Sequence, residues 1–286
     1  MKTLSSANAG TIVIGGERQV NRLGYGAMRL TGPGVWGEPA NPEEAVSVLR
    51  RVVELGVNFI DTADMYGPFV SDMLIKKALH PYQDNLVIAT KVGLVRSGPA
   101  SFAPLGRPEY LRQQVELSLR HLGLECIDLL QLHRIDPTVE LSEQLGELVL
   151  MQQEGKVRHL GLSGVTVEQL EDARQYIEVA SVQNLYNFSM RETETVLEYC
   201  EQYGIVFIPY GPIAAGRLVK SDGVLHDVAK RLDATSSQIA LAWLLKRSPI
   251  ILPIPGTSSV AHLEQNIAAA GIQLSDEDYG ILCKSV

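Results

Sequence analysis

The sequence predicts a single α/β domain over residues 1–286, a (β/α)8 TIM barrel with an N-terminal β-hairpin. Apolar segments of strand length alternate with amphipathic segments of helix length along most of the chain. Three successive apolar segments are followed by ionisable side chains, as in barrels whose active site lies at the carboxyl ends of the strands. The length of 286 residues also suits one barrel, which takes about 250 residues.

The expected elements follow in chain order. Residues 11–21 predict the hairpin, because the pair Gly15-Gly16 separates two short strand-like runs. Eight strands are then predicted at 22–25, 57–60, 86–90, 127–132, 158–162, 180–183, 205–208 and 250–254. Amphipathic helices are predicted at 108–122, 141–154, 166–177, 190–203 and 235–246, with residues 271–286 as a tail after the last helix.

Two helices carry clear signals at their ends. The first is expected to begin after Asn41 as N-cap, with Pro42 at the first helical position, and to end at Gly56. Thr235 and Gln238 have the spacing of a capping box for the helix at 235–246.

A doubly wound sheet is the competing architecture. Residues 32–37 match the glycine spacing of a dinucleotide-binding turn, but Pro33 lacks a backbone donor. Four further residues separate this match from the predicted helix, whereas such glycines must open the helix themselves. We therefore interpret 32–37 as a rim loop in which Trp36 could face a substrate.

Composition excludes several classes of partner. The net charge is -8 and no run of five basic residues occurs, which argues against nucleic acid and anionic membranes as partners. No apolar run reaches the roughly 18 residues that a membrane span needs. Three widely separated cysteines fit neither a disulfide framework nor a metal site. We expect a cytoplasmic protein without a bound metal.

Four ionisable residues follow the predicted strands: Asp61 and Tyr66 after the second, Lys91 after the third and His133 after the fourth. A phenol with a pKa of about 10 is a weak acid at neutral pH, so we expect the Lys91 ammonium to lower the pKa of Tyr66. Lys91 then needs a counter-ion, which Asp61 can supply. His133 could hydrogen-bond a substrate carbonyl oxygen or help to relay the proton, and Asp64 is expected to be a solvated loop residue.

In order and position these four residues match the catalytic tetrad of the aldo-keto reductase superfamily, and the chain resembles that family over essentially its whole length. The sequences of residues 32–37, 66–82 and 254–266 are similar to those of a bacterial branch of the family that includes pyridoxal reductases. Further similarity lies at Leu129–Asp136, Gly161–Ser163, Gln183-Asn184, Ile208–Pro212, Ile254–Thr257 and Asn266.

The resemblance implies an NADPH cofactor, with NADH as the alternative. Ser163 and Gln183 would hold the carboxamide, and Tyr210 would stack on the nicotinamide ring. The pyrophosphate would lie under the loop that contains Gly211, Pro212, Ile213 and Arg217. The adenosine end would lie against Pro255, Gly256, Thr257, Ser258, His262, Gln265 and Asn266.

The chain departs from the family pattern at four of these positions or beside them. Gly164 replaces the Asn that commonly follows Ser163, and Gly256 stands where some members carry Lys. His262 and Gln265 stand where Arg and Glu are usual. Backbone N–H groups and hydroxyls at 256–258, with His262 and Arg217, could still bind a 2′-phosphate.

The implied function is NADPH-dependent reduction of a small-molecule carbonyl, with the proton coming from Tyr66. An aromatic rim of Trp36, Tyr66, Phe69 and the loop that contains Phe102 favours a flat ring such as pyridoxal. The alternative is a nicotinamide-binding redox-sensing subunit similar to potassium-channel β subunits, which would need an apolar surface for its partner. No oligomeric state is predicted from the sequence.

Overall fold

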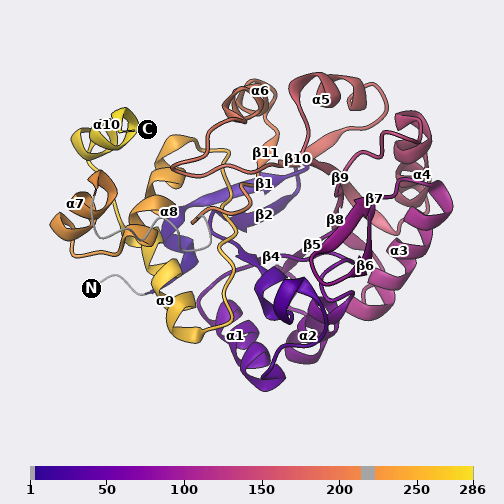
Figure 1. Cartoon of the computed structure of the whole chain (residues 1–286), viewed down its shortest axis with the longest axis horizontal. Helices are drawn as coiled ribbons and strands as arrows, with labels where there is room; N and C mark the ends of the chain where they lie inside the picture. The colour runs from indigo at the N-terminus through magenta and orange to yellow at the C-terminus, as the bar shows by residue number, and fades with distance from the viewer. Residues whose placement is uncertain (1–3, 214–222, 286) are drawn as a thin grey trace.

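The structure is a computed structural model that describes residues 4–213 and 223–285. Its central sheet contains seven parallel strands in the order β3-β4-β5-β8-β9-β10-β11 (Figure 1). Their bounds are β3 (Tyr25–Gly26), β4 (Phe59–Asp61), β5 (Val87–Val92), β8 (Ile127–Leu132), β9 (Val157–Ser163), β10 (Val179–Gln183) and β11 (Val206–Phe207). Neighbouring strands are joined through helices, as the parallel arrangement requires.

Residues 250–254 occupy the eighth strand position and close the barrel. On one side, Phe207 N donates to Ile250 O at 3.0 Å and Leu252 N donates to Phe207 O at 2.9 Å. On the other side, Gly24 N donates to Pro253 O at 2.9 Å. The predicted (β/α)8 barrel is therefore confirmed, although β3 lies later than the predicted first strand at 22–25. Only Tyr25 and Gly26, the two residues before the 3-10 helix that begins at Ala27, pair with β4.

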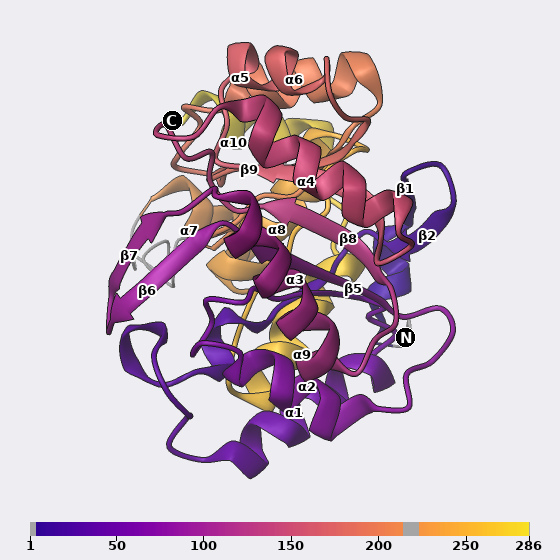
Figure 2. The same cartoon turned by 90° about the vertical axis from the view of Figure 1, so that its right-hand side faces the viewer.

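Helices surround the sheet, as both views show (Figures 1 and 2). Those that follow barrel strands are α1 (Pro42–Glu54), α2 (Val70–Leu79), α3 (Pro108–Leu122), α4 (Leu141–Gln153), α5 (Val167–Ala173), α6 (Glu194–Tyr203) and α8 (Ser236–Arg247). The described chain also contains α7 (Val224–Arg231), α9 (Val260–Ala268) and α10 (Asp276–Lys284). The expected tail at 271–286 is thus wrong, because α10 lies within it. Within the described ranges, no helix has both the length and the apolar character of a membrane span.

The predicted end signals of the first helix and of the helix at 235–246 are confirmed in α1 and α8. Asn41 Oδ1 accepts from Glu44 N, and α1 stops just before Gly56, whose φ is 77°. Thr235 and Gln238 exchange both hydrogen bonds of a capping box at the start of α8. Helices α5 and α6 are shorter than the predicted spans.

Two antiparallel hairpins lie at opposite ends of the barrel (Figure 2). The predicted one pairs β1 (Thr11–Ile14) with β2 (Arg18–Asn21). Its Ile14 and Val20 side chains join the cluster of apolar residues inside the barrel and close its amino-terminal end. The second hairpin pairs β6 (Leu94–Gly98) with β7 (Ser101–Pro104) and follows the carboxyl end of β5. This second hairpin is not among the elements predicted from the sequence.

Candidate active site

The active-site residues continue the inward-facing rows of three barrel strands. Phe59, Ala89 and Leu129 all belong to the interior apolar cluster. Because side chains alternate with a period of two, the next inward positions are Asp61, Lys91 and Gln131. On β10, a register irregularity between Val179 and Ser181 precedes the buried residue Gln183. A polar layer therefore replaces the apolar interior at the carboxyl ends of the strands.

The Lys91 ammonium is the centre of this layer and is fully buried. It donates to Asp61 Oδ2 at 2.6 Å, to the Thr62 carbonyl oxygen at 2.8 Å and to the Tyr66 hydroxyl at 3.4 Å. The other Asp61 oxygen accepts from Gln183 Nε2 at 2.9 Å. Sequence reasoning predicted the Asp61–Lys91 pair and the approach of Tyr66. It missed Gln131, whose amide donates to Asp61 at 3.4 Å and which the strand alternation could have revealed.

Burial decides the protonation of Tyr66. Desolvation raises the pKa of this phenol, and the opposing effect of the Lys91 ammonium reduces the rise without reversing it. The expectation of a lowered Tyr66 pKa is therefore wrong for the described chain, although the contribution of Lys91 has the expected sign. Burial acts on Lys91 in the lowering direction, but Asp61 and Tyr66 outweigh it and the Lys91 pKa is raised. Tyr66 is thus a protonated donor beside a stable cation.

His133 lies across from Tyr66, with the ring centroids 6.3 Å apart and the rings edge to face. Burial, followed by the charges of Lys91 and Arg134, lowers the pKa of His133 well below its usual value. The imidazole is therefore neutral at physiological pH. Its Nδ1 has no hydrogen-bond partner among the described residues. A neutral ring with a free nitrogen is suited to a hydrogen bond with a ligand.

Asp64 is a buried residue, so its expected place as a solvated loop residue is wrong. Burial, followed by the charge of Asp72, raises the Asp64 pKa well above its usual value. Neither carboxyl oxygen has a partner within the described part of the chain. Asp72 lies in the first turn of α2, also buried, and accepts from Thr62 Oγ1 at 2.7 Å. Two buried acids thus lie beside the tetrad.

A cavity of about 650 Å³ begins at Asp61 and Tyr66 and extends along residues 254–266. Most of the residues predicted to bind a cofactor line it: Gln183, Tyr210, Gly211, Pro212, Ile213, Gly256, Thr257, Ser258, His262, Gln265 and Asn266. This set combines hydroxyl and amide side chains with glycines and with the aromatic and apolar surface of Tyr210, Pro212 and Ile213. The chemistry fits a long molecule that has polar groups and a flat ring.

Three predicted residues lie elsewhere. Ser163 is buried behind the cavity wall, where its hydroxyl accepts from Arg134 Nη1 at 2.9 Å. Pro255 is buried between two residues of the wall, Ile254 and Gly256. Arg217 lies outside the residues that the structure describes.

Close backbone contact between β3 and residues 254–257 shapes the cavity wall. A Cβ atom on Gly26 would lie 2.8 Å from Ile254 O, and one on Gly256 would lie 2.5 Å from Gly26 O. The Tyr25 hydroxyl donates to Thr257 O at 2.6 Å and fixes the same segment. Glycine at 256, where some family members carry Lys, is therefore a steric requirement of this backbone arrangement.

Of the predicted aromatic rim, Tyr66 lines the cavity, whereas Trp36, Phe69 and Phe102 do not. The Trp36 ring lies under the Arg96 guanidinium, 5.5 Å from its centroid, and so joins the rim loop to β6. Phe69 instead stacks on His121 of α3 at 4.7 Å, and Phe102 is exposed on β7. Met28 and Arg29 also line the cavity, although neither was named among the predicted site residues. Their position just after β3, at the same end as the tetrad, is the signal that could have found them.

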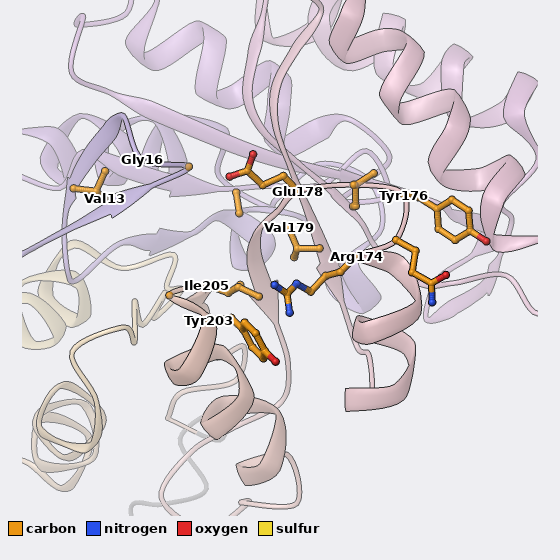
Figure 3. A pocket seen from close by; sticks show the side chains of 13 residues that line it. Val13, Gly16, Arg174, Tyr176, Glu178, Val179, Tyr203 and Ile205 are labelled. Carbon is orange, nitrogen blue, oxygen red and sulfur yellow. The ribbon is translucent and has the colours of Figure 1, made fainter.

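A second cavity of about 520 Å³ lies at the amino-terminal ends of β10 and β11 (Figure 3). The Arg174 guanidinium covers the Tyr203 ring there at 4.0 Å from its centroid. None of its lining residues belongs to the tetrad. Because the ionisable layer lies at the carboxyl ends of the strands, the second cavity is separate from the candidate active site. The described residues also contain no cluster of three or more side chains able to hold a metal ion.

Comparisons with known proteins agree with this geometry. An uncharacterized oxidoreductase of Schizosaccharomyces pombe is 54% identical over 279 residues, which cover 98% of this chain and 90% of the relative. The pyridoxine 4-dehydrogenase of Escherichia coli is 46% identical over 270 residues, which cover 92% of this chain and 93% of the relative.

Among solved structures, a Klebsiella pneumoniae aldo-keto reductase in complex with NADPH has a TM-score of 0.82 at 28% identity. The alignment covers 96% of this chain and 94% of that one. The model of the aldo/keto reductase family matches residues 22–285. The chain therefore belongs to the aldo/keto reductase family.

Proposed function

We propose that the protein is an NADPH-dependent carbonyl reductase. The observation that carries this proposal is the buried Asp61–Lys91–Tyr66 chain of contacts at one end of the long cavity. A phenol that is kept protonated by burial can give its proton to a carbonyl oxygen. The adjacent ammonium, already paired with Asp61, then stabilises the phenolate that remains.

The residues of the cavity fit a nicotinamide cofactor. Gln183 and Tyr210 would face the nicotinamide, with Ser163 behind them, and residues 256–266 would hold the adenosine end. When bound, the reduced cofactor supplies a hydride. Thr257 and Ser258 precede α9, so their hydroxyls and backbone N–H groups are suited to a phosphate. This donor set favours NADPH, with Arg29 as an additional cation beside Gly256.

The neutral His133 ring would fix the substrate carbonyl. Its lowered pKa removes the competing positive charge, so the imidazole can act as a hydrogen-bond donor near Tyr66 without releasing a proton itself. Tyr66 then remains the acid of the reaction. This division of roles is the reason for expecting a large effect from the loss of the Tyr66 hydroxyl.

Pyridoxal is the proposed substrate class, a small aromatic aldehyde. Support comes from the name of the Escherichia coli relative, pyridoxine 4-dehydrogenase, at 46% identity. Tyr66, which lines the cavity, offers aromatic surface to such a ring beside its hydroxyl.

Initial rates with NADPH and pyridoxal test the proposal. Tyr66→Phe should lower kcat by about 100-fold or more, because the general acid is lost while the cavity is kept. NADPH affinity, measured by fluorescence titration, should hardly change. Tyr176→Phe is the matched control, since it removes an exposed phenol at the second cavity.

Retention of most activity in Tyr66→Phe would remove this residue from its role. Tight NADPH binding by the wild-type protein without turnover of any carbonyl compound would favour the redox-sensing alternative instead.

A further inference from the structure

Arg134 lies directly after His133 and folds its guanidinium back into the site. Nη1 donates to the His133 carbonyl oxygen at 2.5 Å and to Ser163 Oγ at 2.9 Å. Nη2 donates to the Tyr210 hydroxyl at 3.3 Å. One side chain therefore links three positions, two of which are assigned to the nicotinamide end of the cavity in the proposed function.

Gly164 provides the space that this guanidinium occupies. A Cβ atom on Gly164 would lie 2.6 Å from Arg134 Cζ and 2.7 Å from Nη1. The residue also has a φ of +66°, a conformation that side chains disfavour. Any larger residue after Ser163 would thus displace the guanidinium. Glycine in place of the common Asn at position 164 therefore allows Arg134 to take this position.

The charge of Arg134 is not neutralised locally. The acceptors of its hydrogen bonds among the described residues are a carbonyl oxygen and two hydroxyls, all uncharged. Lys91, by contrast, has Asp61 as its counter-ion. The Arg134 charge also reaches the reacting groups, since it contributes to lowering the pKa of both Tyr66 and His133. Arg134 is therefore a fixed cation near the catalytic end of the cavity that has no counter-ion among the described residues.

The hydrogen bond to Ser163 has a directional consequence. A hydroxyl has one proton to donate and two lone pairs to accept with. Because one lone pair accepts from Arg134, the Ser163 proton remains available for an acceptor on the cavity side, such as a carboxamide oxygen. Arg134 contacts Tyr210 in the same way, so it holds both side chains in place without lining the cavity itself.

We propose that Arg134 is a positioning residue that makes the site bind the reduced nicotinamide cofactor in preference to the oxidised one. This inference rests on the proposed function, which places the nicotinamide beside Ser163 and Tyr210. The oxidised ring carries a positive charge and the reduced ring is neutral. A fixed cation behind the ring site therefore weakens binding of the oxidised form while leaving that of the reduced form nearly unaffected.

The test measures dissociation constants for NADPH and NADP+ by fluorescence titration, at low and at moderate salt. In Arg134→Gln the ratio of the NADP+ constant to the NADPH constant should fall by about fivefold or more, because the charge is lost. Arg134→Lys keeps the charge but not the planar fork, so both affinities should fall while the ratio stays within about twofold of the wild-type value. Arg50→Gln, at an exposed position on α1, is the matched control.

A purely structural role predicts a different result. Equal weakening of both cofactors in Arg134→Gln, with an unchanged ratio, would overturn the inference. If Arg134→Gln does not fold, Gly164→Ala decides, because its Cβ atom displaces the guanidinium and should lower the same ratio. An unchanged ratio in Gly164→Ala would also overturn the inference. Absence of nicotinamide binding in the wild-type protein would instead contradict the proposed function.

Discussion

Asp72 carries a proton near neutral pH because of its position in the fold. The side chain is fully buried at the start of α2, and burial raises its pKa to about 7. Hydrogen bonds from Thr62 and Ser71 act in the opposite direction but are outweighed. The second carboxyl oxygen has no partner among the described residues, which favours the neutral acid.

Stability should therefore depend on the ionisation of Asp72. Between pH values of about 4 and 7 the folded chain binds a proton that the unfolded chain releases, so this stabilisation is lost as the pH rises through that window. Asp72→Asn mimics the neutral acid and cannot ionise. The unfolding free energy of the variant relative to the wild type should rise by up to about 1.4 kcal/mol per pH unit and level off above about pH 7.

Urea unfolding at several pH values between 5 and 8 measures this difference. A difference that stays constant with pH would show that Asp72 is ionised throughout the range.

The residues of the site were predictable to different degrees. Asp61, Lys91 and His133 follow apolar runs, so their meeting at one end of the barrel could be predicted from strand periodicity. The burial of Asp64 could not, because it depends on how α2 packs over the loop after β4. The contact between Arg134 and Gly164 was equally hidden, since it joins the ends of two strands through the conformation of a long side chain.

Among the elements, those with strong local signals were predicted best. Capping residues and apolar periodicity located α1 and α8 closely. Helix α10 was missed although Ser275 and three acids in its first turn are a clear start signal. The β6–β7 hairpin offered no such signal: residues 101–104 are all exposed, so no alternation marks β7. Contacts of Arg96 with the rim loop join this hairpin to the rest of the fold.

The contact between β3 and residues 254–257 leads to a prediction at this scale. Gly256→Ala would place a Cβ atom 2.5 Å from the Gly26 carbonyl oxygen, so the two segments must separate. We expect a loss of about 1–3 kcal/mol of unfolding free energy, the usual cost of overpacking. Because Thr257 and Ser258 move with the segment, NADPH affinity should fall as well, while Gly271→Ala, with open space around its Cβ position, serves as the control.

Urea unfolding and cofactor titration on the same samples check both effects. An unfolding free energy equal to that of the wild type in Gly256→Ala would mean that β3 and residues 254–257 separate without loss of stability.

For the whole molecule, the barrel architecture was predictable because a parallel sheet covered on both faces needs a series of apolar strands. The apolar run at 250–254 also predicted the strand that closes the barrel, although only a few hydrogen bonds at residues 250–253 hold it there. The excess of acidic residues is a property of the complete chain and bears on its substrate. At a net charge of -8, the protein as a whole repels anions, and only local cations can offset this.

Pyridoxal should consequently be reduced with a higher kcat/KM than pyridoxal phosphate. The rim cation Arg96 already donates to the carbonyl oxygens of Gly34 and Gly98, at 2.7 and 3.1 Å, and Arg29 lies beside the cofactor segment at Gly256. Because Arg134 does not line the cavity, it is not available to a phosphate either. A phosphate left without a cation should cost at least about tenfold in kcat/KM, or about 1.4 kcal/mol.

Initial rates with both compounds at two salt concentrations separate two causes of this preference, which are repulsion by the net charge and the lack of a cation that contacts the phosphate. Repulsion by the net charge weakens with screening, so the preference should narrow as salt is added, whereas a missing phosphate contact leaves it unchanged. Faster reduction of the phosphate ester at either salt concentration would mean that a cation of the site is free to bind phosphate. Arg29→Gln would then identify it, since that variant should lose the preference for the ester if Arg29 is the group responsible.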